Sequence, residues 1–101
     1  MSGAPADAPT CFRVLVSGRV QGVAFRWHAV EQARQLGVDG WIQNLPDGRV
    51  EAWVQGKPVA VESMLSWLER GPTHARVDSV QRHREQPANL HGFDVRRART
   101  S

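Results

Sequence analysis

Over residues 11–17, apolar Phe12, Val14 and Val16 alternate with a partly polar set, which comprises Cys11, Arg13, Leu15 and Ser17. A period of two is typical of a strand with one buried face, so this segment is predicted to be a strand. The spacing then changes to that of a helix, which is carried by Phe25, Ala29, Ala33 and Leu36. Gly37 is predicted to end this helix, because glycine readily adopts the left-handed conformation found at helix ends.

A hairpin is predicted next. Residues 38–45 and 49–55 have strand-like composition, and Pro46, Asp47 and Gly48 between them are typical turn residues. Pro58 then opens a second helix at its first turn, and Gly71 ends it. The apolar stripe of this helix comprises Val61, Met64, Leu65 and Leu68. Residues 75–81 are predicted to form a fourth strand, and residues 93–95 a short last strand.

The order of these elements is strand, helix, strand, strand, helix, strand, with a short terminal strand. This order predicts an α+β domain of the ferredoxin-like split βαβ type (βαββαβ), an antiparallel sheet with two helices packed on one face. The domain is expected over residues 11–97. Residues 1–10 are small, polar and proline-containing, and are predicted to be a disordered tail, while residues 98–101 are expected to form a C-terminal tail.

Composition favours a cytoplasmic protein. The single cysteine, Cys11, excludes an internal disulfide, and the N-terminal residues lack the basic start and apolar run of a signal peptide. The net charge is +3, with Arg96, Arg97 and Arg99 near the end of the chain. This basic end is either a solvated tail or a weak attraction for polyanions.

Candidate chemistry gathers after the first strand, in a loop that contains Gly18 and Gly22 and leads into a helix. Such a loop can direct several backbone N–H groups at one anion, but many turns need glycine for conformation alone. The loop is neither a Walker motif nor a dinucleotide fingerprint, because Gly-Lys-Ser/Thr and the third glycine are absent. A small anion fits such a loop better than a nucleotide.

Two polar side chains accompany the loop. Arg26 lies in the first helical turn, where a cation opposes the helix dipole unless an anion lies between them. The alternatives for Arg26 are exposure to solvent or an ion pair with a carboxylate such as Glu31. Asn44 ends the second strand on the same side as Ile42. It either caps the turn or holds a water molecule, since an amide can donate and accept at once.

Other chemistry-bearing residues favour structural roles. His28, His74, His83 and His91 have no metal-ligand spacing, and no metal or cofactor is expected. Cys11 precedes the loop and is interpreted as an ordinary strand residue. Asp47 is explained by the turn and Glu51 by the polar face of a strand. The tryptophans are spread over four elements, which favours packing roles over a stacking platform: Trp27, Trp41, Trp53 and Trp67.

Two blocks of the sequence resemble the acylphosphatase family. The first matches the family's phosphate loop, G-x-V-Q-G-V-x-F-R, and reads Ser17-Gly18-Arg19-Val20-Gln21-Gly22-Val23-Ala24-Phe25-Arg26. The second matches G-[FYW]-[AVI]-x-N and reads Gly40-Trp41-Ile42-Gln43-Asn44. The separation of Arg26 from Asn44 is also that of the family, and the resemblance covers about residues 11–97. Leu45 departs from some members, which carry a hydroxyl residue there.

The resemblance implies an enzyme that hydrolyses small acyl phosphates to a carboxylate and inorganic phosphate. It implies that Arg26 binds the phosphoryl group and that Asn44 orients the attacking water. The implied phosphate-binding set is Gly18, Val20, Gln21, Gly22, Val23 and Arg26. No metal, cofactor or covalent intermediate is implied, and we expect a monomer that acts on a small molecule, without nucleic acid or membrane as partner.

Two other functions stay open at this stage. The first is a non-catalytic ferredoxin-like module that binds an anion or RNA, since domains of this fold can bind RNA through aromatic residues on the open sheet face. No adjacent pair of strands here has the aromatic-rich sequence expected for that mode. The second is a module of a larger carbamoyl-transferring enzyme, which the length of the chain disfavours.

Overall fold

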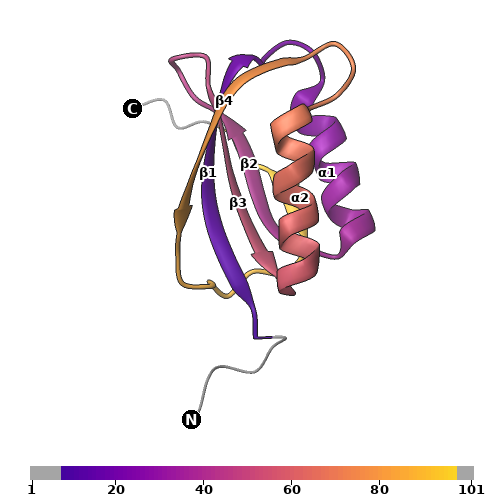
Figure 1. The fold of residues 1–101 in the computed structure, drawn as a ribbon, viewed down its shortest axis with the longest axis vertical. Helices are drawn as coiled ribbons and strands as arrows, with labels where there is room; N and C mark the ends of the chain where they lie inside the picture. The colour runs from indigo at the N-terminus through magenta and orange to yellow at the C-terminus, as the bar shows by residue number, and fades with distance from the viewer. Residues whose placement is uncertain (1–7, 98–101) are drawn as a thin grey trace.

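The computed structural model describes residues 8–97. The predicted N-terminal and C-terminal tails fall largely on residues 1–7 and 98–101, which lie outside the described residues. The elements follow the predicted order (Figure 1). They are β1 (Thr10–Arg19), α1 (Phe25–Leu36), β2 (Asp39–Asn44), β3 (Val50–Gly56), α2 (Pro58–Arg70), β4 (Arg76–Arg84) and β5 (Phe93–Val95).

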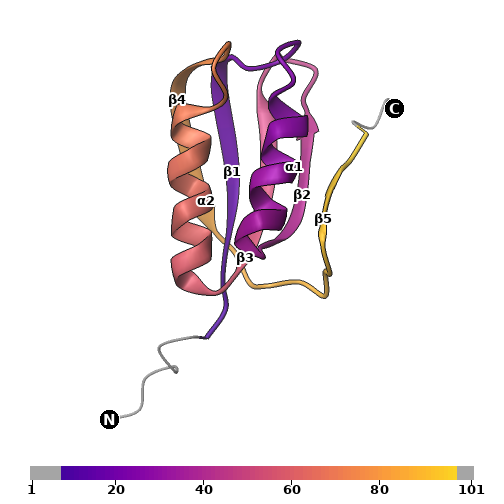
Figure 2. The same ribbon diagram turned by 90° about the vertical axis from the view of Figure 1, so that its right-hand side faces the viewer.

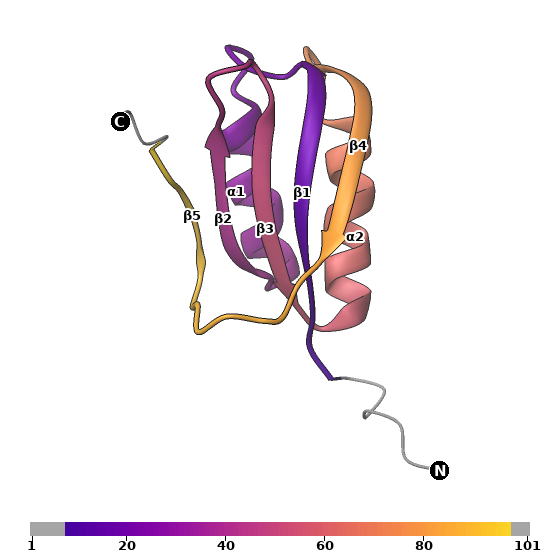
Figure 3. The same cartoon turned by 90° about the vertical axis from the view of Figure 1, so that its left-hand side faces the viewer.

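The molecule has two layers. Both helices lie side by side on one face of the sheet (Figure 2), and the opposite face carries no helix (Figure 3). The strand order is β4-β1-β3-β2-β5, and β1 to β4 pair antiparallel with their neighbours. The predicted ferredoxin-like α+β fold is confirmed.

The short strand β5 adds a feature that the predicted antiparallel sheet did not include. It pairs parallel with β2, so the five-stranded sheet is mixed. Figure 3 shows the cause, because the chain leaves β4, crosses one end of the sheet and returns along the opposite edge. The side chain of Arg34 on α1 donates to the carbonyl of Phe93 at 3.4 Å, and the backbone N–H of Arg96 donates to Ile42 at 2.8 Å. These contacts attach β5 to both layers.

The edge strand β4 extends to Arg84, beyond the predicted end at Gln81. The prediction stopped early because residues 81–84 are all polar and show no buried face. The strand continues because its backbone keeps pairing with β1 as far as Phe12 and Arg84. Charged side chains along an edge strand also oppose pairing with another chain.

The core lies between the helices and the sheet. Both predicted helical stripes are buried except for Leu36, which is partly buried, and Phe25 packs against Trp67 with ring centroids 5.5 Å apart. The sheet contributes Val14, Val16, Ile42, Val50, Ala52 and Val54. Burial of these apolar side chains, at about 1.5–3 kcal/mol for each large one, holds both helices on the sheet. α1 lies over β2 and β5, and α2 lies over β1, β3 and β4, so both ends of the loop between β1 and α1 are held by the core.

The open face of the sheet carries an aromatic pair. The tryptophans were predicted to have packing roles and not to form a stacking platform for nucleic acid. The β2–β3 register sets Trp41 opposite Trp53, and their rings stack with centroids 6.1 Å apart. The guanidinium of Arg96 lies 4.4 Å from the centroid of Trp41. On the same face, Arg13 forms an ion pair with Glu51 at 3.2 Å. An acidic group therefore adjoins the aromatic pair.

In the described part of the chain, none of the helices has both the length and the apolar character needed to cross a membrane.

Candidate active site

The loop between β1 and α1 has an unusual backbone. Gly22 has φ 76°, and Ala24 at the N-cap of α1 has φ 58° and ψ 28°, which makes it the one non-glycine residue with positive φ in the described chain. Left-handed residues within a turn direct neighbouring N–H groups to one side, as in anion-binding nests. The first turn of α1 contains no acidic residue and no side-chain cap. Its N–H groups and the positive end of the helix dipole are therefore available to an anion.

Arg26 lies in this first turn and lines a cavity next to the loop. The predicted alternatives were exposure to solvent and an ion pair with a carboxylate such as Glu31, and Arg26 is half-buried. The ion pairs among residues 8–97 involve Arg13, Arg34, Arg49, Arg76 and Arg82, and none involves Arg26. The charge of Arg26 is thus not neutralised by a described carboxylate.

Asn44 reaches the same cavity from the end of β2. Its Oδ1 is buried and has no hydrogen-bond partner. Every other buried side-chain nitrogen or oxygen in the described chain has a partner. A buried acceptor without a partner costs about 1–3 kcal/mol, so it is normally satisfied by water or a ligand. If this oxygen capped the turn, it would accept a hydrogen bond from the turn, and no such bond is present.

The cavity has a volume of about 480 Å³. It brings together five of the predicted site residues, namely Val20, Gln21, Gly22, Arg26 and Asn44. The loop residues come from the end of β1 and the start of α1, whereas Asn44 comes from β2. The fold therefore brings two separate blocks of the sequence to one site.

Gly18 and Val23 do not line this cavity. Gly18 has φ 131°, and a Cβ there would lie 2.1 Å from the backbone oxygen of Arg76 on β4. The β1–β4 register also shifts at this point. Glycine is thus required at position 18 because two strands approach each other closely there. Val23 lines a second cavity, together with Trp67 and His74. The phosphate-binding role predicted for these two residues gains no support from the lining of the cavity.

The side chain of Gln21 makes contacts that sequence reasoning did not predict. Its Nε2 donates to the backbone oxygens of Leu45 and Arg49, each at 2.9 Å. The backbone N–H of Leu45 in turn donates to Arg49 at 2.8 Å. Gln21 therefore attaches the loop to the β2–β3 turn, directly after Asn44. Sequence reasoning missed this tie because its two acceptors are backbone atoms of a distant turn.

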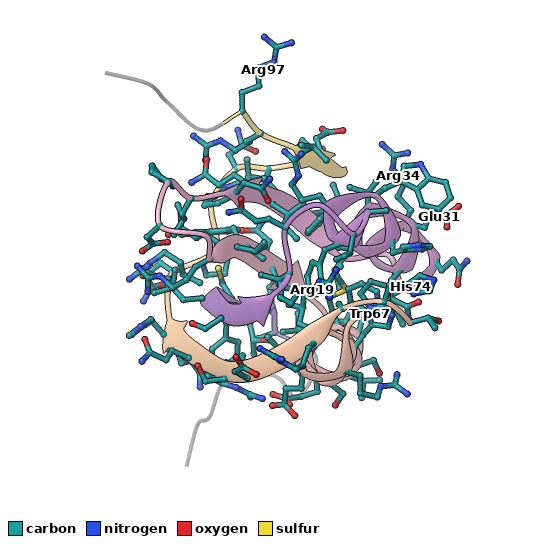
Figure 4. All side chains as sticks on the ribbon, turned by 90° about the horizontal axis from the view of Figure 1, so that it is seen from above. Arg19, Glu31, Arg34, Trp67, His74 and Arg97 are labelled. Carbon is teal, nitrogen blue, oxygen red and sulfur yellow. The ribbon has the colours of Figure 1, made fainter. Side chains whose placement is uncertain are left out.

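Seven further residues line the cavity that sequence reasoning did not assign to the site: Ala24, Phe25, Trp27, Val30, Glu31, Arg34 and Val95. A signal existed for two of them, because Val30 and Arg34 follow Arg26 at i+4 and i+8 and so share its helix face. Figure 4, which looks onto the end of the molecule with the loop, shows Glu31 and Arg34 on the same side of α1. Val95 arrives from β5, and no local pattern predicts that contact.

The carboxylates near the turn are occupied with structural roles, as predicted. The backbone N–H of Arg49 donates to Asp47 at 3.0 Å, and this bond is the main cause that lowers the pKa of the Asp47 carboxyl. Glu51 accepts from Gln43 at 2.7 Å on the open sheet face. Neither carboxylate lines the cavity, so neither is placed for acid–base chemistry there.

Cys11 is buried, and burial, with a smaller contribution from the Glu85 carboxylate, raises the pKa of its thiol to about 11. A thiol with a raised pKa is a poor nucleophile at neutral pH, which agrees with a structural role. Residues 8–97 contain no cluster of His, Cys, Asp or Glu that could hold a metal ion.

Comparison with known proteins identifies the family of this chain. The sequence model of the acylphosphatase family matches residues 12–95. An acylphosphatase of Nitrosococcus oceani is 53% identical over 87 residues, which cover 86% of this chain and 98% of that protein.

Solved structures agree with the sequence match. An acylphosphatase from Coxiella burnetii has a TM-score of 0.84 at 36% identity, over 87% of this chain and 93% of that one. An acylphosphatase from Bacillus subtilis has a TM-score of 0.82 at 30% identity, over 85% and 97%. With one family matched over most of its length in both sequence and fold, this chain belongs to the acylphosphatase family.

Proposed function

We propose that the chain hydrolyses small acyl phosphates to a carboxylate and inorganic phosphate in the cavity between the loop and β2. In this proposal the phosphoryl group lies against the backbone N–H groups of Val20–Gly22 and the start of α1, and Arg26 binds two of its oxygens. A guanidinium supplies two parallel donors, which match a phosphoryl group. Membership of the acylphosphatase family supports this reaction.

The role of Asn44 in the proposal is to position water. Its buried Oδ1 accepts from a water molecule, which directs a lone pair of that water at phosphorus. The water forms a new P–O bond while the P–O bond to the acyl oxygen breaks, and the carboxylate leaves. The proton of the water goes to a phosphoryl oxygen of the substrate. The acyl phosphate has a good leaving group, so positioning and charge stabilisation supply most of the rate enhancement.

One observation carries this proposal. An arginine in no ion pair and a buried amide oxygen without a partner line the same cavity, although they come from different blocks of the chain. A purely structural, buried amide oxygen is normally satisfied within the protein. A cation in the first turn of a helix is disfavoured by the helix dipole unless an anion lies there. A site that binds a dianion and a water molecule gives both groups a partner.

The direct test is release of inorganic phosphate from acetyl phosphate by the purified chain, above the spontaneous rate. Turnover supports the enzyme. Binding of phosphate without turnover would favour the alternative, a non-catalytic module that binds an anion. Saturable binding of single-stranded RNA without turnover would favour the RNA-binding form of that alternative.

We further propose that the protein works as a monomer in the cytoplasm. The cavity is lined by residues of one chain, so the proposed chemistry needs no partner copy. Cys11 is buried and is the single cysteine of the sequence, which suits a reducing compartment. Light scattering of the purified protein checks the monomer, and fractionation of the source cells checks the location.

A further inference from the structure

The cavity extends beyond the proposed phosphate site along an apolar wall. Three large hydrophobic side chains are exposed in the described chain, and two of them, Trp27 at 59% and Val95 at 45%, line this cavity. The third, Val59 at 82%, lies on α2 and does not line it. Exposed apolar side chains are common singly, but two that face one cavity next to a reactive site indicate a ligand surface.

The wall is continuous with the proposed site of reaction. Trp27 follows Arg26 directly, and Val30 lies one helical turn further along α1. On the other side, Val95 pairs in register with Ile42, two residues before Asn44. A group attached to a phosphoryl group between Arg26 and Asn44 is therefore within reach of this wall.

The size of the cavity also exceeds what phosphate needs. Its volume is about 480 Å³, within the range of about 300–1,000 Å³ typical of sites for larger organic ligands. The part nearest the loop serves the phosphoryl group. The remaining part is available to the acyl group of the substrate.

Charges on the wall indicate which acyl groups fit. Arg34 is paired with Asp94 at 3.4 Å, so part of its charge is already compensated. Glu31 lines the same cavity and forms no ion pair with a described cation. A carboxylate without a cation repels an acyl group that carries its own negative charge.

We propose that Trp27, Val30 and Val95 form an acyl-binding wall that selects acyl phosphates with an uncharged, apolar acyl group. An aromatic or branched acyl group would cover the exposed surface of Trp27 and Val95, and this apolar burial favours it over an acetyl group. The inference rests on the proposed function, because it concerns the substrate of that same site.

The test compares kcat/KM for benzoyl phosphate, acetyl phosphate and succinyl phosphate. We expect the unaltered chain to prefer benzoyl phosphate to both of the others. Trp27→Ala should reduce the ratio of benzoyl to acetyl phosphate kcat/KM about 10-fold, mainly through KM for benzoyl phosphate. Val95→Ser should reduce it in the same direction. Val59→Ser is the matched control, since it removes an exposed valine outside the cavity, and it should leave the ratio unchanged.

Two results would overturn the acyl-binding wall. An unchanged ratio in Trp27→Ala and Val95→Ser would show that neither side chain contacts the acyl group. A preference for succinyl phosphate that Arg34→Ala removes would assign this end of the cavity to an anionic acyl group instead. Either result leaves the proposed function intact as long as acetyl phosphate is hydrolysed, whereas no turnover of any acyl phosphate would refute the proposed function itself.

Discussion

The side-chain amide of Gln21 donates to the backbone oxygen of Leu45 at 2.9 Å, and it thereby attaches the proposed phosphate loop to the residue that follows Asn44. A second bond, to Arg49 at 2.9 Å, holds the other side of the same turn. This one amide group thus links the loop directly to the turn that follows Asn44. Catalysis by positioning depends on such distances, and errors of about 1 Å can reduce rates about 100-fold.

Gln21→Ala should therefore lower kcat for acetyl phosphate by about 10- to 100-fold. Each carbonyl keeps one backbone donor, Gly48 for Leu45 and Leu45 for Arg49. The variant therefore loses two ordinary hydrogen bonds, and the free energy of unfolding should also fall by about 1–3 kcal/mol. Steady-state kinetics and urea denaturation measure the two effects. Gln81→Ala on the exposed edge strand is the matched control, and equal kcat values for the two variants would refute the positioning role of Gln21.

Arg26→Ala should reduce kcat/KM by about 1,000-fold or more and weaken inhibition by inorganic phosphate, because the phosphoryl group loses its bidentate cation. Arg26→Lys should restore little, since an ammonium cannot supply two parallel donors. Arg19→Ala removes the same charge at the end of β1, where the loop begins, but Arg19 does not line the cavity. Similar losses in the Arg19 and Arg26 variants would reduce the role of Arg26 to general electrostatic attraction.

Ala24→Gly should stabilise the protein by about 1 kcal/mol, because Ala24 has φ 58° and non-glycine residues pay a steric penalty in that region. Ala60→Gly, within α2, is the control with the opposite sign and should destabilise by about 1 kcal/mol. Urea denaturation of both variants checks the pair. A loss of stability in both would mean that the loop is not strained at Ala24.

The Cys11 thiol should make stability depend on pH in the alkaline range. Its pKa is raised from 9.0 to about 11 in the folded chain, so the unfolded chain ionises first. The buried, neutral thiol therefore contributes fully to the free energy of unfolding below pH 9, and this contribution is lost as the pH rises to about 11. The sequence has no tyrosine and one lysine, Lys57, so few other groups titrate in this window. Denaturation midpoints between pH 8 and 11 should fall more for the unaltered chain than for Cys11→Ala, and parallel curves would contradict the assignment.

Local patterns predicted most of the fold and the two central side chains. The alternation over residues 11–17, the helical stripes and the hairpin turn are short-range signals, and each formed the expected element. Arg26 and Asn44 stand in compact motifs, so both were identified from the sequence as candidate site residues. Their placement in one cavity is a property of the fold, and the predicted topology was sufficient to anticipate it.

Long-range relationships explain what was missed. The parallel pairing of β5 depends on the path of a connection that carries no regular pattern. The requirement for glycine at position 18 comes from the backbone of Arg76 on another strand. The stacking of Trp41 on Trp53 follows from strand register. In each case the partner lies far along the chain, so no window of sequence contains the cause.

The proposed role of Asn44 is tested by two measurements on the same folded Asn44→Ala protein, turnover of acetyl phosphate and competitive inhibition by phosphate. If the buried Oδ1 of Asn44 holds the attacking water, kcat should fall by about 100-fold or more while the inhibition constant for phosphate stays within about 2-fold. Asn44→Asp should not restore turnover, because a carboxylate repels the dianion and lacks the N–H donor. Unchanged kcat would return Asn44 to a structural role at the turn. An equal loss of turnover and phosphate affinity would make Asn44 part of the phosphate site and contradict its role as the water-positioning residue.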